Sequence, residues 1–210
     1  MKTNRRNFLG MVGSGTVALS LGAVESVAAS TLAEENSAAS GEKKVVILLT
    51  HPNYGDSKAN RALVEAVKDI RGVTVVHLYD APFTIAAYRD LLAGAGTVVF
   101  QFPFYWASAP SQLKKWCDEI FIGLAEQIKG VKLLVATTTG SEYDAYRSGR
   151  RNLFTLDELL RPYQVLAHHS GMVWQTPFVL YGASLPTAAE SITAGTATYK
   201  EIIKKLLVES

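Results

Sequence analysis

The chain contains little cysteine and little net charge. Only one of its 210 residues is cysteine, Cys117, which excludes an intramolecular disulfide. The formal net charge of +2 gives no reason to expect nucleic acid as a partner. This excess lies at the N-terminus, because three basic residues and one acidic residue before residue 30 contribute +2 and leave zero for the rest.

Histidine is also scarce, and its placement argues against one enzyme class. The run Gly55-Asp56-Ser57 matches the GDS box of serine esterases, whose histidine base is expected near the C-terminus. No histidine follows His169, so an esterase is disfavoured.

We also expect no metal site. Cys117 falls on the apolar face of a predicted helix, which favours a packing role over a catalytic one.

A charge-free run at residues 7–24 follows the paired Arg5-Arg6 and precedes the small residues at 27–29. This layout is typical of a secretory signal, and the paired arginines resemble the twin-arginine type. We therefore expect a signal peptide at 1–29, a polar linker at 30–42 and export to the periplasm. The alternative is an uncleaved membrane anchor, although the run is short for a bilayer span and diluted by glycine.

From Lys43 onward, apolar runs alternate with helical patterns. Five runs predict strands: 43–50, 73–79, 97–102, 131–138 and 172–180. The intervening patterns predict five helices. The first begins at a Ser57 cap and ends at Gly72, the second lies near 86–93, and the third begins from Pro110. The last two cover 156–168, with a break at Pro162, and 187–208. This alternation predicts one α/β domain over 43–210, with a parallel sheet covered on both faces.

Residues 98–121 are the most informative stretch. A buried strand ends at Pro103, an aromatic turn Phe104-Tyr105-Trp106 follows, and a helix begins from Pro110. Exposed aromatics and free amides at the carboxyl edge of a parallel sheet are typical of sites that hold flat ligands. The alternative interpretation is an ordinary connection whose aromatics pack in the core.

Three predicted loops, 51–60, 103–108 and 137–146, must open on that same edge. The first runs into a helix N-terminus, where backbone amides with Ser57 and Asn60 form a cradle for an anion. The third is rich in hydroxyls, and Gly140 allows close backbone approach. An anion cradle beside aromatic and amide-rich loops suits a flat heterocycle with a phosphate tail, and flavin mononucleotide (FMN) is the first candidate.

Ordered motifs strengthen this interpretation: THPxxxxSxAN, FQFPFYWxSxPxxLKKWxDExF, TTG, FTLDELLRPYQ and GMxWxxPFVLYG. Together they resemble the flavodoxin-like NAD(P)H:quinone oxidoreductases, in particular the ancillary flavoproteins of glutathione-gated potassium efflux and their general-stress relatives. The resemblance covers Lys43 to Val208. It implies a flavodoxin-like three-layer αβα sandwich with a five-stranded sheet in the order 2-1-3-4-5, and a homodimer.

The resemblance also implies roles for residues of the three loops. The FMN phosphate and ribityl chain would contact His51, Ser57, Lys58, Ala59 and Asn60. The isoalloxazine would contact Phe104, Tyr105, Trp106 and Ala107 on one side, and Thr138, Thr139, Gly140 and Ser141 on the other. Tyr146, with Tyr143, would lie beside the reactive face. Without the resemblance, three alternatives stay open: His51 as a strand-end histidine bonded to the backbone, Trp106 as a core residue, and the two tyrosines as solvated loop residues.

The implied function is an FMN-dependent NAD(P)H oxidoreductase that passes two electrons, by ping-pong kinetics, to a quinone or similar flat acceptor. The alternative is an ancillary or regulatory flavin-binding subunit that serves a membrane transporter. By the same resemblance, the segment between Phe121 and Lys132 is shorter than in relatives, which predicts a more open flavin face and adds weight to the alternative without making it the leading interpretation. For an exported protein, another redox protein is an alternative electron donor to NAD(P)H.

Overall fold

The computed structural model describes residues 43–208. The expected signal peptide (1–29) and linker (30–42) lie outside these residues, as do 209 and 210. Within the described part of the chain, no helix combines the length and the apolar character needed to span a bilayer.

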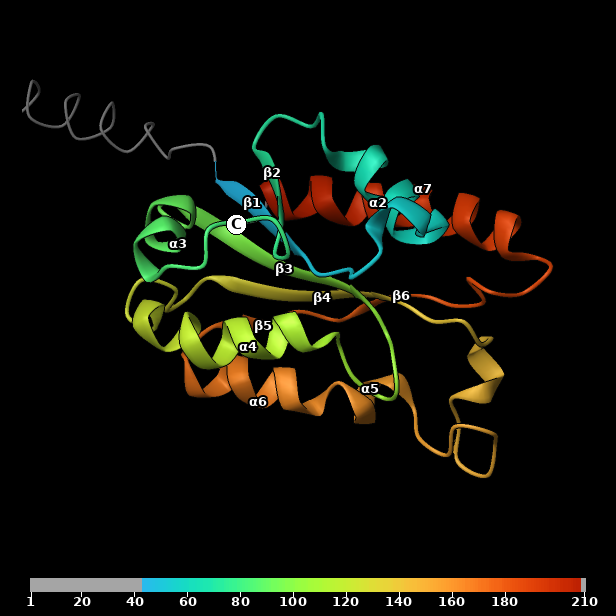
Figure 1. Cartoon of the computed structure of the whole chain (residues 1–210). Helices are drawn as coiled ribbons and strands as arrows, with labels where there is room; N and C mark the ends of the chain where they lie inside the picture. Colours follow the sequence, from blue (N-terminus) through green and yellow to red (C-terminus); the bar gives the residue numbers. More distant parts are fainter. Residues whose placement is uncertain (1–42, 209–210) are drawn as a thin grey trace, which may run out of the picture. The chain divides into compact units, whose positions relative to one another are not determined.

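A parallel sheet forms the centre of the domain (Figure 1). Its strands run in the order β2-β1-β3-β4-β5, and β6 also pairs with β4. Their bounds are β1 Lys44–Leu49, β2 Val73–His77, β3 Ala95–Pro103, β4 Lys132–Thr138, β5 Val173–Trp174 and β6 Phe178–Leu180. The central strands β1, β3 and β4 are continuous apolar runs because both of their faces are buried. The predicted α/β class and strand order are confirmed.

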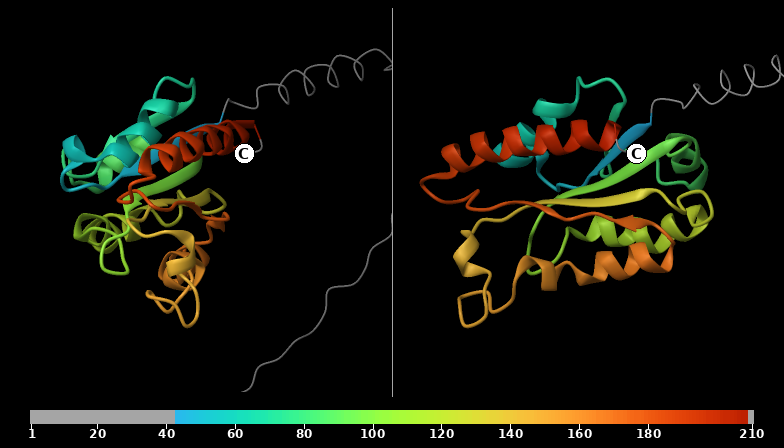
Figure 2. Two further views of the ribbon diagram at one scale, coloured as in Figure 1. Left: turned by 90° about the vertical axis from the view of Figure 1, so that its right-hand side faces the viewer. Right: turned by 180° about the vertical axis from the view of Figure 1, so that it is seen from behind.

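Helices cover both faces of the sheet, as Figure 2 shows from two further directions. The helices α2 and α7 pack together on one face, and α3, α4 and α6 lie on the other. The helix bounds are α2 Lys58–Val67, α3 Ile85–Leu91, α4 Ser111–Glu119, α5 Leu156–Leu159, α6 Arg161–His169 and α7 Ala188–Val208. Three short 3-10 turns complete the fold: η1 Tyr54–Asp56, η2 Phe121–Leu124 and η3 Tyr143–Ala145.

Each face of the sheet has its own apolar core. Under α3 and α4, the ring of Trp116 packs edge-on against Tyr88 and Phe100, with centroids 5.4 and 5.8 Å apart. Under α2 and α7, Tyr199 packs on Phe178 at 5.1 Å. Cys117 packs against the first core, and burial raises the pKa of its thiol to about 12, so it stays protonated at neutral pH. A packing role therefore accounts for this cysteine.

Three local expectations need correction. The single strand expected over 172–180 is two strands, because Pro177 has no amide proton to donate to β4. The helix expected to end at Gly72 ends at Val67, and Gly72 instead accepts a hydrogen bond from the Val45 amide at 2.8 Å. Pro110 is the N-cap of α4 and not its first helical residue.

Candidate functional site

A cleft of about 800 Å³ opens at the carboxyl ends of β1, β3 and β4. These strand ends lie toward the right of Figure 1. The lining of the cleft comes from the loops after these strands and from the loop after β6. The predicted residues that line it are His51, Ser57, Lys58, Ala59, Asn60, Phe104, Tyr105, Trp106, Thr138, Thr139, Gly140, Ser141 and Tyr146. The fold thus brings together residues as far apart in sequence as 51 and 146.

The first wall is the N-terminus of α2. Ser57 caps this helix, and its hydroxyl accepts a hydrogen bond from the Asn60 amide at 3.2 Å. The hydroxyl proton of Ser57 stays available to a ligand, as do amides of the first turn that have no partner within the helix. Lys58, in that same turn, is exposed and adds a positive charge. This end of the cleft therefore suits an anion.

The second wall is the aromatic turn after β3. Tyr105 and Ser108 exchange two backbone hydrogen bonds, of 2.9 and 3.0 Å, which places Trp106 and Ala107 at the tip of a tight turn. Both tip residues have positive φ, 48° and 61°. Trp106 is fully exposed and Tyr105 is 46% exposed, so the interpretation of Trp106 as a core residue is wrong. Phe104 is buried below them.

His51 lies at the end of β1 and is 9% exposed. Its Nδ1 accepts a hydrogen bond from the Asn53 amide at 3.1 Å, and its Nε2 lies 3.5 Å from the Tyr105 hydroxyl. Burial lowers the pKa of His51, and the Asp56 carboxylate offsets part of this effect. The ring is therefore neutral near pH 7. Because Nδ1 accepts, the proton of the neutral ring is on Nε2, on the side of Tyr105.

The two candidate catalytic tyrosines lie in different surroundings. Tyr146 is 8% exposed and packs between Phe104 and Tyr181, with ring centroids 6.2 and 5.9 Å away. Burial raises the pKa of Tyr146, so its hydroxyl is neutral near pH 7. Tyr143 lies outside the cleft lining, packs on Tyr181 at 5.3 Å and accepts a hydrogen bond from Arg147 at 3.3 Å. Ala107 also lies outside the lining.

The fourth loop, after β6, closes the cleft and was missed by sequence reasoning. Gly182 and Ala183 donate backbone hydrogen bonds to Ser141 and Thr139, at 2.9 and 2.8 Å. A Cβ atom on Gly140 would lie 3.0 Å from the Ser184 Oγ, so a larger residue at position 140 would require the Ser184 side chain to move. The topology could have predicted this loop, because residues that follow the expected fifth parallel strand must also lie at the carboxyl edge of the sheet.

Comparison with known proteins assigns the family. A profile for the flavodoxin-like fold matches residues 43–203. The chain belongs to this flavodoxin-like family.

Relatives within the flavodoxin-like family are named for redox and transport roles. The uncharacterised NAD(P)H oxidoreductase YdeQ of Bacillus subtilis is 37% identical over 151 residues, 67% of this chain and 77% of that protein. The glutathione-regulated potassium-efflux system ancillary protein KefG of Cronobacter sakazakii is 35% identical over 73% of this chain and 89% of its own length. The solved general stress protein 14 of Treponema denticola, in complex with FMN, has a TM-score of 0.71 and 26% identity. That match covers 78% of this chain and 99% of the other.

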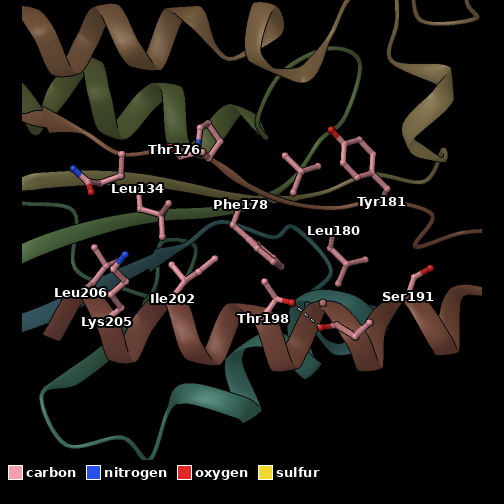
Figure 3. Close-up of a pocket in the computed structure, with 15 residues that line it drawn as sticks. Leu134, Thr176, Phe178, Leu180, Tyr181, Ser191, Thr198, Ile202, Lys205 and Leu206 are labelled. Carbon is pink, nitrogen blue, oxygen red and sulfur yellow. Dashed lines mark hydrogen bonds between the residues drawn. The ribbon is translucent and has the colours of Figure 1, made fainter. Parts of the chain in front are cut away.

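This flavodoxin-like chain has a second cavity, of about 640 Å³, between β6 and α7 (Figure 3). Its lining is mainly apolar, and Lys205 is its single charged residue. One of its few hydroxyls, on Thr198, already donates to the Ala194 carbonyl at 3.1 Å. This cavity between β6 and α7 therefore lacks the convergent polar groups of the cleft at the carboxyl ends of the strands. We assign the candidate site to that cleft.

Proposed function

We propose that the chain binds FMN in the cleft and transfers electrons from NAD(P)H to a quinone or another small flat acceptor. The observation that carries this proposal is one cleft in which an anion-binding helix N-terminus faces an aromatic turn across the ends of β1, β3 and β4. The FMN complex of the Treponema denticola relative and the naming of YdeQ as an NAD(P)H oxidoreductase support it.

The residues present fit FMN in size and chemistry. A cleft of about 800 Å³ lies within the usual range for small-molecule sites, roughly 300–1,000 Å³. The negative charge of Asp56 and the positive charge of Lys58 in its lining cancel, so the N-terminus of α2 provides the main attraction for a phosphate. Thr138, Thr139 and Ser141 supply hydroxyls opposite the aromatic turn.

Each wall then has a definite task. Ser57 and the first-turn amides of α2 would hold the phosphate, and the turn at Tyr105 and Trp106 would flank the ring. When bound, FMN supplies the capacity to accept and return a hydride. His51 and Tyr146 are both neutral near pH 7, so each offers a hydrogen-bond donor without adding a buried charge. The exposed Trp106 leaves the outer side of the cleft open to a flat acceptor.

Anaerobic reduction tests the proposal. The FMN-loaded protein is mixed with NADH or NADPH, and loss of flavin absorbance is followed before a quinone is added. We expect bleaching by at least one nucleotide and recovery of the absorbance with the quinone. Tyr146→Phe should slow bleaching about tenfold or more if its hydroxyl acts at the reactive face. Tyr163→Phe, whose hydroxyl accepts from the Ala109 amide at 3.3 Å outside the cleft, is the matched control.

A second candidate function is an ancillary flavin-binding subunit with little turnover. The observation in its favour is the KefG relative, which is named as an ancillary protein of a potassium-efflux system. The short connection after α4 leads to the start of β4 at the amino edge of the sheet, opposite the cleft, so its length does not determine how far the cleft of the same chain is covered. Tight FMN binding without bleaching by either nucleotide would select this candidate. A membrane transporter or a redox protein is then the expected partner, and a homodimer the expected assembly.

We also propose that the protein is exported through its paired Arg5-Arg6 signal. Replacement of both arginines by lysine should retain the protein in the cytoplasm, as cell fractionation would show. Unchanged export would remove the twin-arginine interpretation, and a membrane-bound product of full length would favour the anchor.

A further inference from the structure

Beneath the cleft, four buried polar side chains form a continuous chain of hydrogen bonds across the domain. The Tyr199 hydroxyl on α7 donates to Gln101 Oε1 on β3 at 3.0 Å. Gln101 Nε2 donates to the Asn60 backbone carbonyl and to Asn60 Oδ1 on α2, at 3.2 and 3.4 Å. Asn60 Nδ2 donates to Thr138 Oγ1 at the end of β4, at 3.1 Å. Each of these residues is at most 5% exposed.

The direction of these hydrogen bonds is fixed by one backbone group. The Asn60 carbonyl can only accept, so the nitrogen of the Gln101 amide must face α2 and its oxygen must face Tyr199. Burial raises the pKa of Tyr199, so its hydroxyl retains the proton that it donates. With Asn60 Oδ1 facing Gln101, Asn60 Nδ2 is left to donate to Thr138.

Thr138, the last residue of this hydrogen-bond network, has a hydroxyl proton without an acceptor in the described part of the chain. Thr138 Oγ1 already accepts from Asn60, so its own proton needs another acceptor. No such acceptor is present among the hydrogen bonds of residues 43–208, and Thr138 lines the cleft. A buried donor without a partner costs free energy, and an acceptor atom of a ligand would remove this cost.

We propose that the hydrogen-bond network Tyr199–Gln101–Asn60–Thr138 orients the Thr138 hydroxyl so that it donates a hydrogen bond to an acceptor oxygen of the bound cofactor. Tyr199 is then a positioning residue that lies on α7 and acts on the cleft through Gln101 and Asn60. This inference rests on the proposed function, because it takes FMN as the ligand. It also accounts for Gln101, a glutamine in the apolar run VVFQF of β3.

The experiment measures FMN dissociation constants by quenching of flavin fluorescence. Tyr199→Phe removes one hydroxyl and leaves the ring on Phe178. We expect it to weaken FMN binding about five- to tenfold. Thr138→Val, which removes the proposed donor, should weaken binding at least as much, and Thr138→Ser should restore it. The double variant Tyr199→Phe/Thr138→Val should bind no worse than Thr138→Val alone, because both changes remove the same interaction.

Tyr88→Phe is the matched control, since it removes a hydroxyl that is equally buried beside Trp116 on the opposite face of the sheet. Because the Tyr88 hydroxyl has no hydrogen-bond partner within residues 43–208, its removal should leave the free energy of unfolding unchanged or raise it, and FMN affinity should stay unchanged. Wild-type affinity of Tyr199→Phe or Thr138→Val, or additive losses in the double variant, would overturn the network while leaving the proposed function intact. A wild-type protein that does not bind FMN would overturn both.

Discussion

Ser57 is expected both to cap α2 and to bind the FMN phosphate, and a comparison of Ser57→Ala with a second cap variant distinguishes these two roles. Ser57→Ala removes the acceptor of the Asn60 amide, a contact of 3.2 Å at the start of α2. Loss of an N-cap costs about 1 kcal/mol, which corresponds to a fall of about 2–4 °C in Tm for a domain of this size. Thr84→Ala removes the equivalent cap of α3, where the Thr84 hydroxyl accepts from the Ala87 amide at 3.4 Å outside the cleft.

The two variants should differ in their affinity for FMN. A hydrogen bond to a charged phosphate is worth about 1.5–3 kcal/mol, and Ser57 is half-buried, so we expect the lower end of this range. FMN binding should therefore weaken about tenfold in Ser57→Ala and remain unchanged in Thr84→Ala. Isothermal titration with FMN and thermal unfolding of the apo proteins measure both quantities. Equal FMN affinity in the two variants, with Tm lowered in both, would refute the phosphate cradle at α2.

Three further predictions follow from the geometry. Trp106→Ala should weaken FMN binding without lowering Tm, because the indole is fully exposed; unchanged affinity would remove Trp106 from the contacts. Ala107→Gly should raise the free energy of unfolding by about 1 kcal/mol, because φ of Ala107 is 61°. The control Ala197→Gly, at an exposed position in the middle of α7, should lower this free energy by about 1 kcal/mol. A lower free energy of unfolding in both variants, measured by denaturant titration, would contradict the strained turn. The folded state depresses the pKa of His51 below its ordinary 6.5, so His51 contributes stability above pH 6.5 that is lost as pH falls through the folded pKa. The urea midpoint of the wild-type protein should be higher at pH 8 than at pH 5.5, and His51→Gln should reduce this difference. The control His168→Gln should leave the difference as in wild type. A His51→Gln protein with the same difference as wild type and the control would contradict this assignment.

The sequence predicted the layered fold because its signals are local. The apolar runs that became β1, β3 and β4 are long and bounded by turn residues, and the predicted cap at Ser57 directly precedes α2. The break in the last strand at Pro177 was foreseeable in kind, since proline is tolerated only at an edge, but not in its exact bounds.

The site was predictable where topology forces residues together. Loops after parallel strands must meet at one edge, which brings His51, Phe104 and Thr138 to one cleft. The exposure of Trp106 agrees with the expected aromatic turn, but the hydrogen bonds by which Tyr105 and Ser108 close that turn were not predictable from local spacing. The Tyr199–Gln101 hydrogen bond joins residues 98 apart, and local spacing carries no information about such a pair.

Titration of the apo protein with FMN and, separately, with riboflavin tests the central claim most directly. The two ligands share the ring and differ by the phosphate that the N-terminus of α2 is expected to hold. One FMN should bind per chain, and riboflavin should bind at least tenfold more weakly. Absence of FMN binding, or equal affinity for the two ligands, would contradict the account.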